Sequence, residues 1–144
     1  MNLNINTGGI RLTINEDPNR VIEFNPDDIA FVENFYSLIS EFEDKEVEFK
    51  KKAKELEKNT ELDSYGIPKN TKGAIALMRE VCDYFRGKID SVFGDGTSNT
   101  AFGKANTIEM FAEFFEGITP FIQKARTGKI EKYTGNRGQR RAMK

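Results

Sequence analysis

The strongest structural signal in this sequence is NPDDIAFVENFYSLISEF, residues 25–42, where a helix start runs directly into an apolar stripe. Asn25 is expected to cap the helix and Pro26 to occupy its first position. Asp27 and Asp28 then face the positive end of the helix dipole. Apolar side chains follow at steps of three and four: Ile29, Val32, Phe35, Tyr36, Ile39 and Phe42. This spacing predicts an amphipathic helix with one buried face.

The same helix is predicted to continue to residue 58 through a charged segment, EFEDKEVEFKKKAKELEK, residues 41–58. Glu and Lys recur there at a spacing of four, which stabilises a solvated helix. A helix over residues 26–58 would be about 50 Å long. Its second half is therefore expected to project, or to lie against another subunit through Val47, Phe49, Ala53 and Leu56. The alternative is a charged helix that only meets solvent.

The first 25 residues predict a small antiparallel β-meander. Apolar and polar residues alternate over residues 3–5 and again over residues 10–14, with the turn-forming Thr-Gly-Gly at residues 7–9 between them. A second turn is predicted at Asp-Pro-Asn, residues 17–19, before a third strand over residues 21–24.

Two further helices follow a linker over residues 59–70. The first is predicted over residues 71–93 and ends at a glycine, and its apolar face contains Cys82, which indicates a buried thiol. The second is predicted over residues 106–132. Pro120 lies inside it and is expected to kink the helix or break it in two.

These elements predict an α+β fold that is mostly α: the meander, three or four amphipathic helices, and a basic C-terminal tail. Residues 1–133 are expected to form a single domain and residues 134–144 a flexible tail. Residues 124–144 hold eight basic residues and one acidic residue, a net charge of +7, whereas the rest of the chain carries −8. Such a basic end can bind nucleic acid, an acidic protein partner, or the acidic body itself.

The glycine-rich stretch SVFGDGTSNTAFGKAN, residues 91–106, resembles a binding loop but fails each motif. A phosphate loop needs a glycine where Ser98 stands and a hydroxyl where Ala105 stands. A dinucleotide fingerprint would need a third glycine at Asn99, and Asp95 alone does not make a calcium loop. The stretch therefore predicts a tight connection between helices, with a docking surface around Phe93 and Phe102 as the alternative.

Catalytic chemistry has little support in this composition. The chain has no histidine, which removes the usual base for serine or cysteine nucleophiles and the commonest nitrogen ligand of zinc. Most carboxylates lie in charged helical faces or at helix starts. We therefore expect no enzymatic activity, no cofactor and no metal site.

Three features together resemble a known family: the strand-forming start that leads into an amphipathic helix, the turn in DSVFGDGTSNTAFGKAN, residues 90–106, and the ending YTGNRGQRRAMK, residues 133–144. The chain is similar to the tail assembly chaperones of long-tailed, siphophage-type bacteriophages and of prophages of Gram-positive bacteria. The similarity extends loosely from about residue 70 to the end.

The resemblance implies a non-enzymatic, helical, oligomer-forming protein that binds the phage tape-measure protein and helps to recruit tail-tube subunits. It would act in the cytoplasm of the bacterial host and be absent from the mature virion. The start of the chain lacks the features of a secretory signal, and no segment has the length of a membrane span. The alternatives are a structural tail or neck protein of the particle, and a nucleic-acid-binding regulator.

The candidate protein-binding residues are aromatic side chains of the later helices and arginines of the basic end. The face around Phe114, Phe115 and Phe121 is expected to stay partly exposed, because three aromatic stripes exceed what a small bundle can bury. The full set is Phe93, Phe102, Phe114, Phe115, Phe121, Arg137, Arg140 and Arg141.

Overall fold

The computed structural model describes the backbone of residues 1–142 and the side chains of residues 1–127. Two strands, β1 (Ile10–Ile14) and β2 (Asp17–Phe24), form an antiparallel hairpin. Four helices follow: α1 (Ile29–Glu57), α2 (Thr71–Phe93), α3 (Thr97–Phe102) and α4 (Ile108–Ala142). The predicted class, α+β and mostly α, is confirmed.

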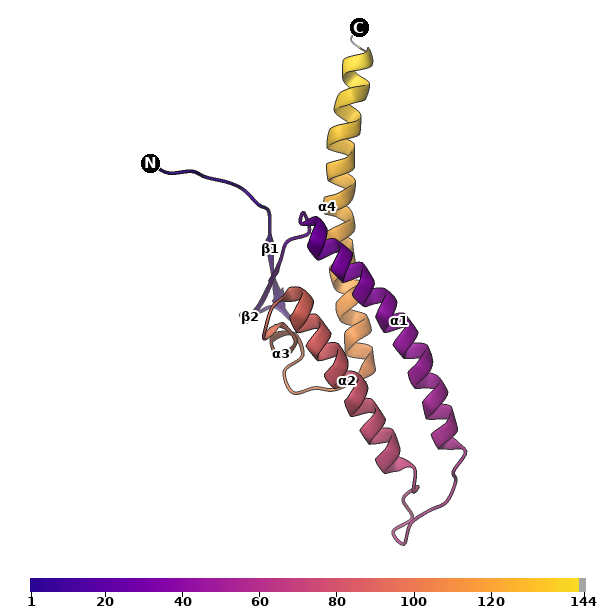
Figure 1. Ribbon diagram of the computed structural model, residues 1–144. Coiled ribbons are helices and arrows are strands. Elements are labelled where there is room, and N and C mark those ends of the chain that lie inside the picture. Colours follow the sequence, from indigo (N-terminus) through magenta and orange to yellow (C-terminus); the bar gives the residue numbers. More distant parts are fainter. Residues whose placement is uncertain (143–144) are drawn as a thin grey trace.

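The predicted three-stranded meander is wrong, because the sheet has only two strands. Residues 1–9 form no strand and project from the body as an extended arm (Figure 1). Leu3 and Ile5 alternate as a strand would, but they are 80% and 71% exposed and face no core. The alternating pattern agrees with the extended backbone of these residues, but their apolar side chains do not pack against the core.

The turn between the strands lies two residues earlier than predicted. Asn15 and Glu16 both adopt positive φ, 52° and 61°, as the central residues of a tight I′-type hairpin turn do. Pro18 and Asn19, which were predicted to form the turn, belong to β2, where the register shifts opposite Thr13 and Ile14. Proline is tolerated where the register is irregular, because the partner strand does not need a hydrogen bond from the N–H that proline lacks.

Helix α1 is continuous, but it starts later than predicted. Its N-cap is Asp28, whose carboxylate accepts a hydrogen bond from Ala30 N at 3.0 Å. Asn25 was the predicted cap; its side-chain oxygen instead accepts from Asp27 N at 3.0 Å, in a turn that precedes the helix. Pro26 lies in the same turn and is buried, so it is not the first helical residue.

The predicted bounds of α2 are confirmed, and Gly94 ends the helix at a φ of 120°. Cys82 is fully buried on the face of α2 that meets the core, as predicted. Helix α4 is one continuous helix that passes through Pro120, so the predicted break does not occur. It also continues to Ala142, where the sequence predicted a flexible tail from residue 134; residues 143 and 144 lie outside the described residues.

Contacts between phenylalanine rings join the helices to one another and to the hairpin. Helices α1 and α2 run antiparallel, α4 crosses behind them, and its C-terminal half extends past the body (Figure 1). Phe93, at the end of α2, contacts rings from three other elements at centroid distances of 5.1–5.9 Å: Phe24, Phe31, Phe35 and Phe114. A second group joins the middle of the bundle: Phe42, Phe85, Phe111 and Phe115. Such contacts add about 0.5–1.5 kcal/mol each beyond the burial of apolar area.

Candidate protein-binding groove

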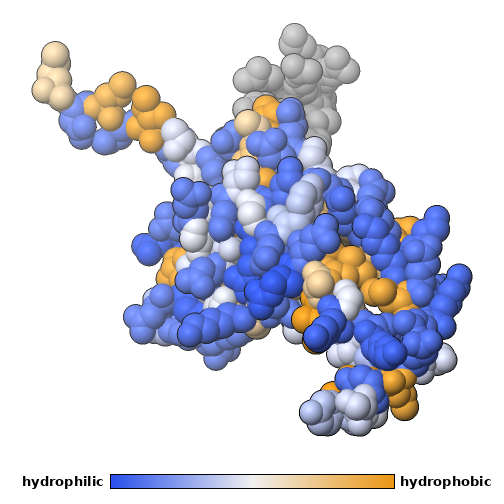
Figure 2. Space-filling model, turned by 60° about the horizontal axis from the view of Figure 1, so that its bottom comes forward, coloured by the Kyte–Doolittle hydropathy of each residue, from blue (hydrophilic) through white to orange (hydrophobic). Residues whose placement is uncertain are grey.

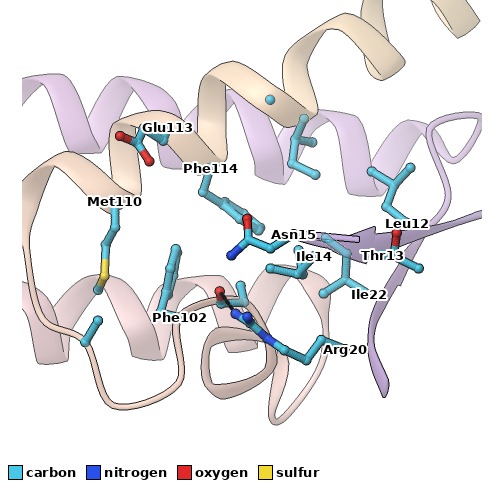
Figure 3. Close-up of a pocket in the computed structure, with 14 residues that line it drawn as sticks. Leu12, Thr13, Ile14, Asn15, Arg20, Ile22, Phe102, Met110, Glu113 and Phe114 are labelled. Carbon is cyan, nitrogen blue, oxygen red and sulfur yellow. Dashed lines mark hydrogen bonds between the residues drawn. The ribbon is translucent and has the colours of Figure 1, made fainter. Parts of the chain in front are cut away.

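An open groove of about 500 Å³ lies between the hairpin, α3 and α4 (Figure 3). One wall is β1, from which three consecutive residues line the groove, Leu12, Thr13 and Ile14, followed by Asn15 of the hairpin turn. Successive side chains of a strand point to opposite faces, so consecutive lining residues mean that the groove reaches the edge of β1. Among the described residues, β1 pairs only with β2, and this edge is unpaired.

The opposite wall is a single stripe of α4. Its residues are spaced three and four apart along the helix: Met110, Glu113, Phe114, Gly117 and Ile118. Gly117 sits in the middle of the stripe, and a Cβ built there would meet nothing within 4 Å. The wall is therefore hollowed at Gly117, and any larger side chain there would enter the groove.

Arg20 fastens β2 to α3 at the base of the groove. Its Nε donates to the carbonyl of Thr100 at 2.9 Å. Its Nη2 donates to the carbonyl of Ala101 at 2.6 Å, and this second bond is drawn in Figure 3. These carbonyls lie in the last turn of α3, where the helix leaves its acceptors without backbone partners and favours a cation. Arg20 therefore fixes the distance between the hairpin and α3.

The start of α3 is held by α2. The carboxylate of Asp90 accepts hydrogen bonds from Ser98 N at 2.8 Å and from Ser98 Oγ at 3.1 Å. Arg86, one turn earlier on α2, donates to Asn106 Oδ1 at 3.0 Å and to the carbonyl of Ala105. The glycine-rich stretch that resembled a binding loop is thus a structural connection, as predicted, with a short helix inside it.

The predicted binding residues divide between the groove and the core. Phe102 and Phe114 both line the groove, with ring centroids 5.5 Å apart. Phe93 and Phe115 lie behind them in the aromatic core. Of Arg137, Arg140 and Arg141, the structure places the backbone in α4, and their side chains lie outside the described residues.

The expected exposure of the α4 aromatic face is only partly right. Phe114 and Phe115 are 8% and 5% exposed, so the prediction is wrong for both. Phe121 is 41% exposed, as expected. The hairpin and α3 cover residues that a plain helical bundle would have left open, because Phe24, Phe102 and Ile22 pack over the end of the bundle.

The second half of α1 is mostly charged surface with a partly covered inner side. Val47 is 68% exposed, whereas Phe49, Ala53 and Leu56 are half-buried. Ion pairs join Lys50 to Glu46 at 3.0 Å and Lys52 to Glu48 at 3.3 Å, as the spacing of four predicts. Hydrogen bonding and the charges of Lys52 and Lys45 lower the pKa of the exposed Glu48.

The described residues contain no cluster of metal-ligating side chains, and the one thiol is buried. No group of three or more His, Cys, Asp or Glu in that part of the chain could hold a metal ion. The one thiol, Cys82, is buried, and this desolvation raises its pKa, which suppresses the reactive thiolate. No helix in the same part of the chain is both long and apolar enough to cross a membrane.

Sequence reasoning missed the groove because its walls are far apart in the chain. Leu12 and Ile14 were interpreted only as part of an alternating strand, and Met110 and Gly117 were not proposed as binding residues. A signal was present: Met110, Phe114, Gly117 and Ile118 lie on one helical stripe, and a glycine in such a stripe leaves a gap that a neighbouring segment can enter.

The model of one protein family matches residues 18–144, and the chain belongs to that family, which is described as a family of unknown function, DUF6673. The matched residues include all four helices and nearly all of β2, and thus every wall of the groove except β1. Comparisons with curated proteins and with solved structures found no match.

Proposed function

We propose that this member of the family of unknown function is a non-enzymatic tail assembly chaperone, which binds the phage tape-measure protein and helps to recruit tail-tube subunits. The observation that carries the proposal is the open groove between β1 and α4. It combines an unpaired strand edge with apolar side chains of four elements, β1, β2, α3 and α4, which is the composition of a polypeptide-binding site.

The groove suits an apolar client segment. Phe102 presents ring surface and packs on the nearly buried Phe114, and Met110 adds a flexible side chain that adapts to different partners. The volume of about 500 Å³ admits several side chains. A tape-measure protein is long and rich in apolar residues, so covering such segments before the tail assembles would keep the client from aggregating.

The basic end of α4 supplies a second element of the proposal. Residues 124–144 carry a net charge of +7, and α4 extends beyond the body as far as Ala142 (Figure 1). A projecting cationic helix favours an acidic surface, such as one on a tail-tube subunit, through long-range attraction that speeds encounter. Such a chaperone would act in the host cytoplasm and leave before the virion is complete.

The test is co-purification of the tape-measure protein of the same phage or prophage, after co-expression with the wild-type chain or with Gly117→Leu. Leucine at this position would fill the hollow in the α4 wall, and leucine has a higher helix propensity than glycine. We expect Gly117→Leu to reduce recovery of the client at least about tenfold. Gly87→Leu is the matched control, because Gly87 is also an exposed helical glycine with open space around it and lies on α2, outside the groove.

Equal recovery with both variants would contradict the groove as the client site, and no recovery with the wild-type chain would contradict the chaperone function. Proteomics of purified particles separates the remaining structural alternative. A chaperone should be absent from the particle, whereas a tail or neck protein should be present in stoichiometric amount.

A further inference from the structure

The N-terminal arm, residues 1–9, is an extended segment whose apolar side chains pack against nothing in the described body. All nine residues are exposed, and Leu3 and Ile5 point from one side of the arm at 80% and 71% exposure. Figure 2 shows the arm standing clear of the body with hydrophobic surface along it. The arm contains no charged side chain. A segment of this composition gains free energy by adding to a sheet edge.

The point where the arm leaves the body is fixed. Asn25 Nδ2 donates to the carbonyl of Thr7 at 2.5 Å. Gly8 adopts a φ of +87°, and a Cβ built there would lie 2.6 Å from Asn25 Oδ1 and 2.7 Å from Asp27 Oδ2. The backbone therefore passes close to these two side chains and is directed away from β1. With Thr7 held in this way, residues 3–5 do not return to pair with β1 of their own chain.

The groove has the two features that an added strand requires, an unpaired strand edge and an apolar surface. It has the unpaired edge of β1 along one side and the apolar stripe of α4 along the other, with Phe102 between them (Figure 3). A strand added beside β1 would lie about 4.8 Å from it and place alternate side chains toward α4. Gly117 leaves room for such a side chain in the α4 wall.

We propose that the arm of a second copy of this chain occupies the groove as a strand added to β1, and that two copies exchange their arms reciprocally. Leu3 and Ile5 of one copy then lie against the α4 stripe of the other. The arm and its acceptor are present in every copy, so the exchange closes into a dimer and leaves no groove open.

Charge and area both fit this occupant. The groove holds two opposite charges, Arg20 and Glu113, and so presents no net charge to an arm without charged side chains. A stable interface buries about 1,200–2,000 Å² in total, counting the surface of both partners. If residues 1–6 of each arm make the contact, twelve residues share this area, which is roughly 100–170 Å² for each residue. Side chains as exposed as Leu3 and Ile5 have that much surface to lose on the face that meets α4.

The exchange goes beyond the proposed chaperone function and does not depend on it. If both are right, the arm covers the groove until a client segment displaces it. A variant without a functional arm would then bind the client at least as well as the wild-type chain. Gly117→Leu, which fills the groove, would weaken binding of both the client and the arm of the second copy.

The test is the self-association of the full-length chain, measured by sedimentation over a range of concentrations. We expect a dimer for the wild-type chain, and a dissociation constant raised at least about tenfold both by the double change Leu3→Asp and Ile5→Asp and by Gly117→Leu. The matched control is Leu62→Asp with Ile67→Asp, which changes the same residue types at 58% and 48% exposure in the linker between α1 and α2. This control should dimerise as the wild-type chain does.

Contact between the arm and β1 is tested directly by mixing two variants, Asn4→Cys and Thr13→Cys, with a short bifunctional thiol cross-linker. The native Cys82 is buried and does not interfere. We expect a cross-linked heterodimer, and none when Thr13→Cys is replaced by Asp83→Cys on the exposed side of α2. A wild-type chain that stays monomeric at all concentrations, or a dimer that survives the arm variant, would overturn the proposal.

Discussion

Asp90 of α2 holds both the backbone N–H and the hydroxyl of Ser98, at 2.8 and 3.1 Å, and so fixes the first turn of α3 against the end of α2. Ser98 is 4% exposed and is the one buried polar residue of the described core. A six-residue helix has little stability of its own. Its place in the groove therefore depends on this contact and on Arg20 at its other end.

Asp90→Ala should lower the free energy of unfolding by about 1–3 kcal/mol, because it leaves the buried hydroxyl and N–H of Ser98 without an acceptor. Urea denaturation measures the change. Asp83→Ala, at an exposed position of the same helix, should change it by less than about 0.5 kcal/mol. Equal effects of the two variants would show that the Asp90 contact does not stabilise α3.

The helices could be predicted from the sequence because their signals are local. The stripe from Ile75 to Val92 and the glycine after Phe93 lie within a few turns of one another, and the bounds of α2 came out as predicted. The start of α1 was placed too early because both Asn25 and Asp28 are good caps, and the buried position of Pro26 decides between them. Burial of that kind depends on the rest of the fold.

The groove could not be predicted because it depends on packing between distant segments. Phe114 was expected to be exposed, and it is buried since Phe102 of α3 covers it from another part of the chain. Two of the predicted binding residues, Phe102 and Phe114, do line the groove. Leu3 and Ile5 were predicted to lie in a strand and do not, because alternating residues do not specify whether an extended segment finds a sheet edge to join.

Arg20→Lys should lower the free energy of unfolding by about 1–2 kcal/mol, because lysine cannot donate to the carbonyls of Thr100 and Ala101 at once with the same fixed geometry. The effect should appear in thermal denaturation as a lower midpoint. Arg11→Lys is the control: Arg11 pairs with Glu23 at 2.9 Å, but their side chains are 71% and 66% exposed, and such pairs contribute little. A larger loss at Arg11 than at Arg20 would contradict this assignment.

The stability of the fold should fall in alkaline solution in a manner that depends on Cys82. Burial raises the pKa of the Cys82 thiol above the ordinary value of about 8.5. Below that value both the folded and the unfolded states keep the proton, and the buried neutral thiol costs nothing. As the pH rises further, the unfolded state loses its proton first, so the free energy of unfolding falls until the folded thiol also ionises.

The measurement compares the wild-type chain with Cys82→Ala by urea denaturation between pH 7 and pH 10. The difference between the two proteins should shrink by up to about 1.4 kcal/mol for each pH unit above 8.5. Other alkaline groups act on both proteins and cancel. A difference that stays constant, or that grows with pH, would mean that the folded thiol ionises at least as easily as the unfolded one.

Pro120→Ala should raise the free energy of unfolding by about 2–2.6 kcal/mol. Proline inside α4 has no N–H for the carbonyl of Glu116, and its ring crowds that carbonyl, which together cost about 3 kcal/mol relative to alanine. Part of this gain is offset because alanine leaves the unfolded chain freer by about 0.4–1 kcal/mol. Thr119 Oγ1 already donates to the carbonyl of Phe115 at 2.6 Å, so the turn before the proline is held by a side chain and should not change.

Urea denaturation followed by helical circular dichroism measures the gain, with Gln123→Ala at an exposed site of α4 as the control that should stay within about 0.5 kcal/mol. A loss of stability in Pro120→Ala would show that the helix around Pro120 is held by contacts of the proline ring instead of by the backbone ladder.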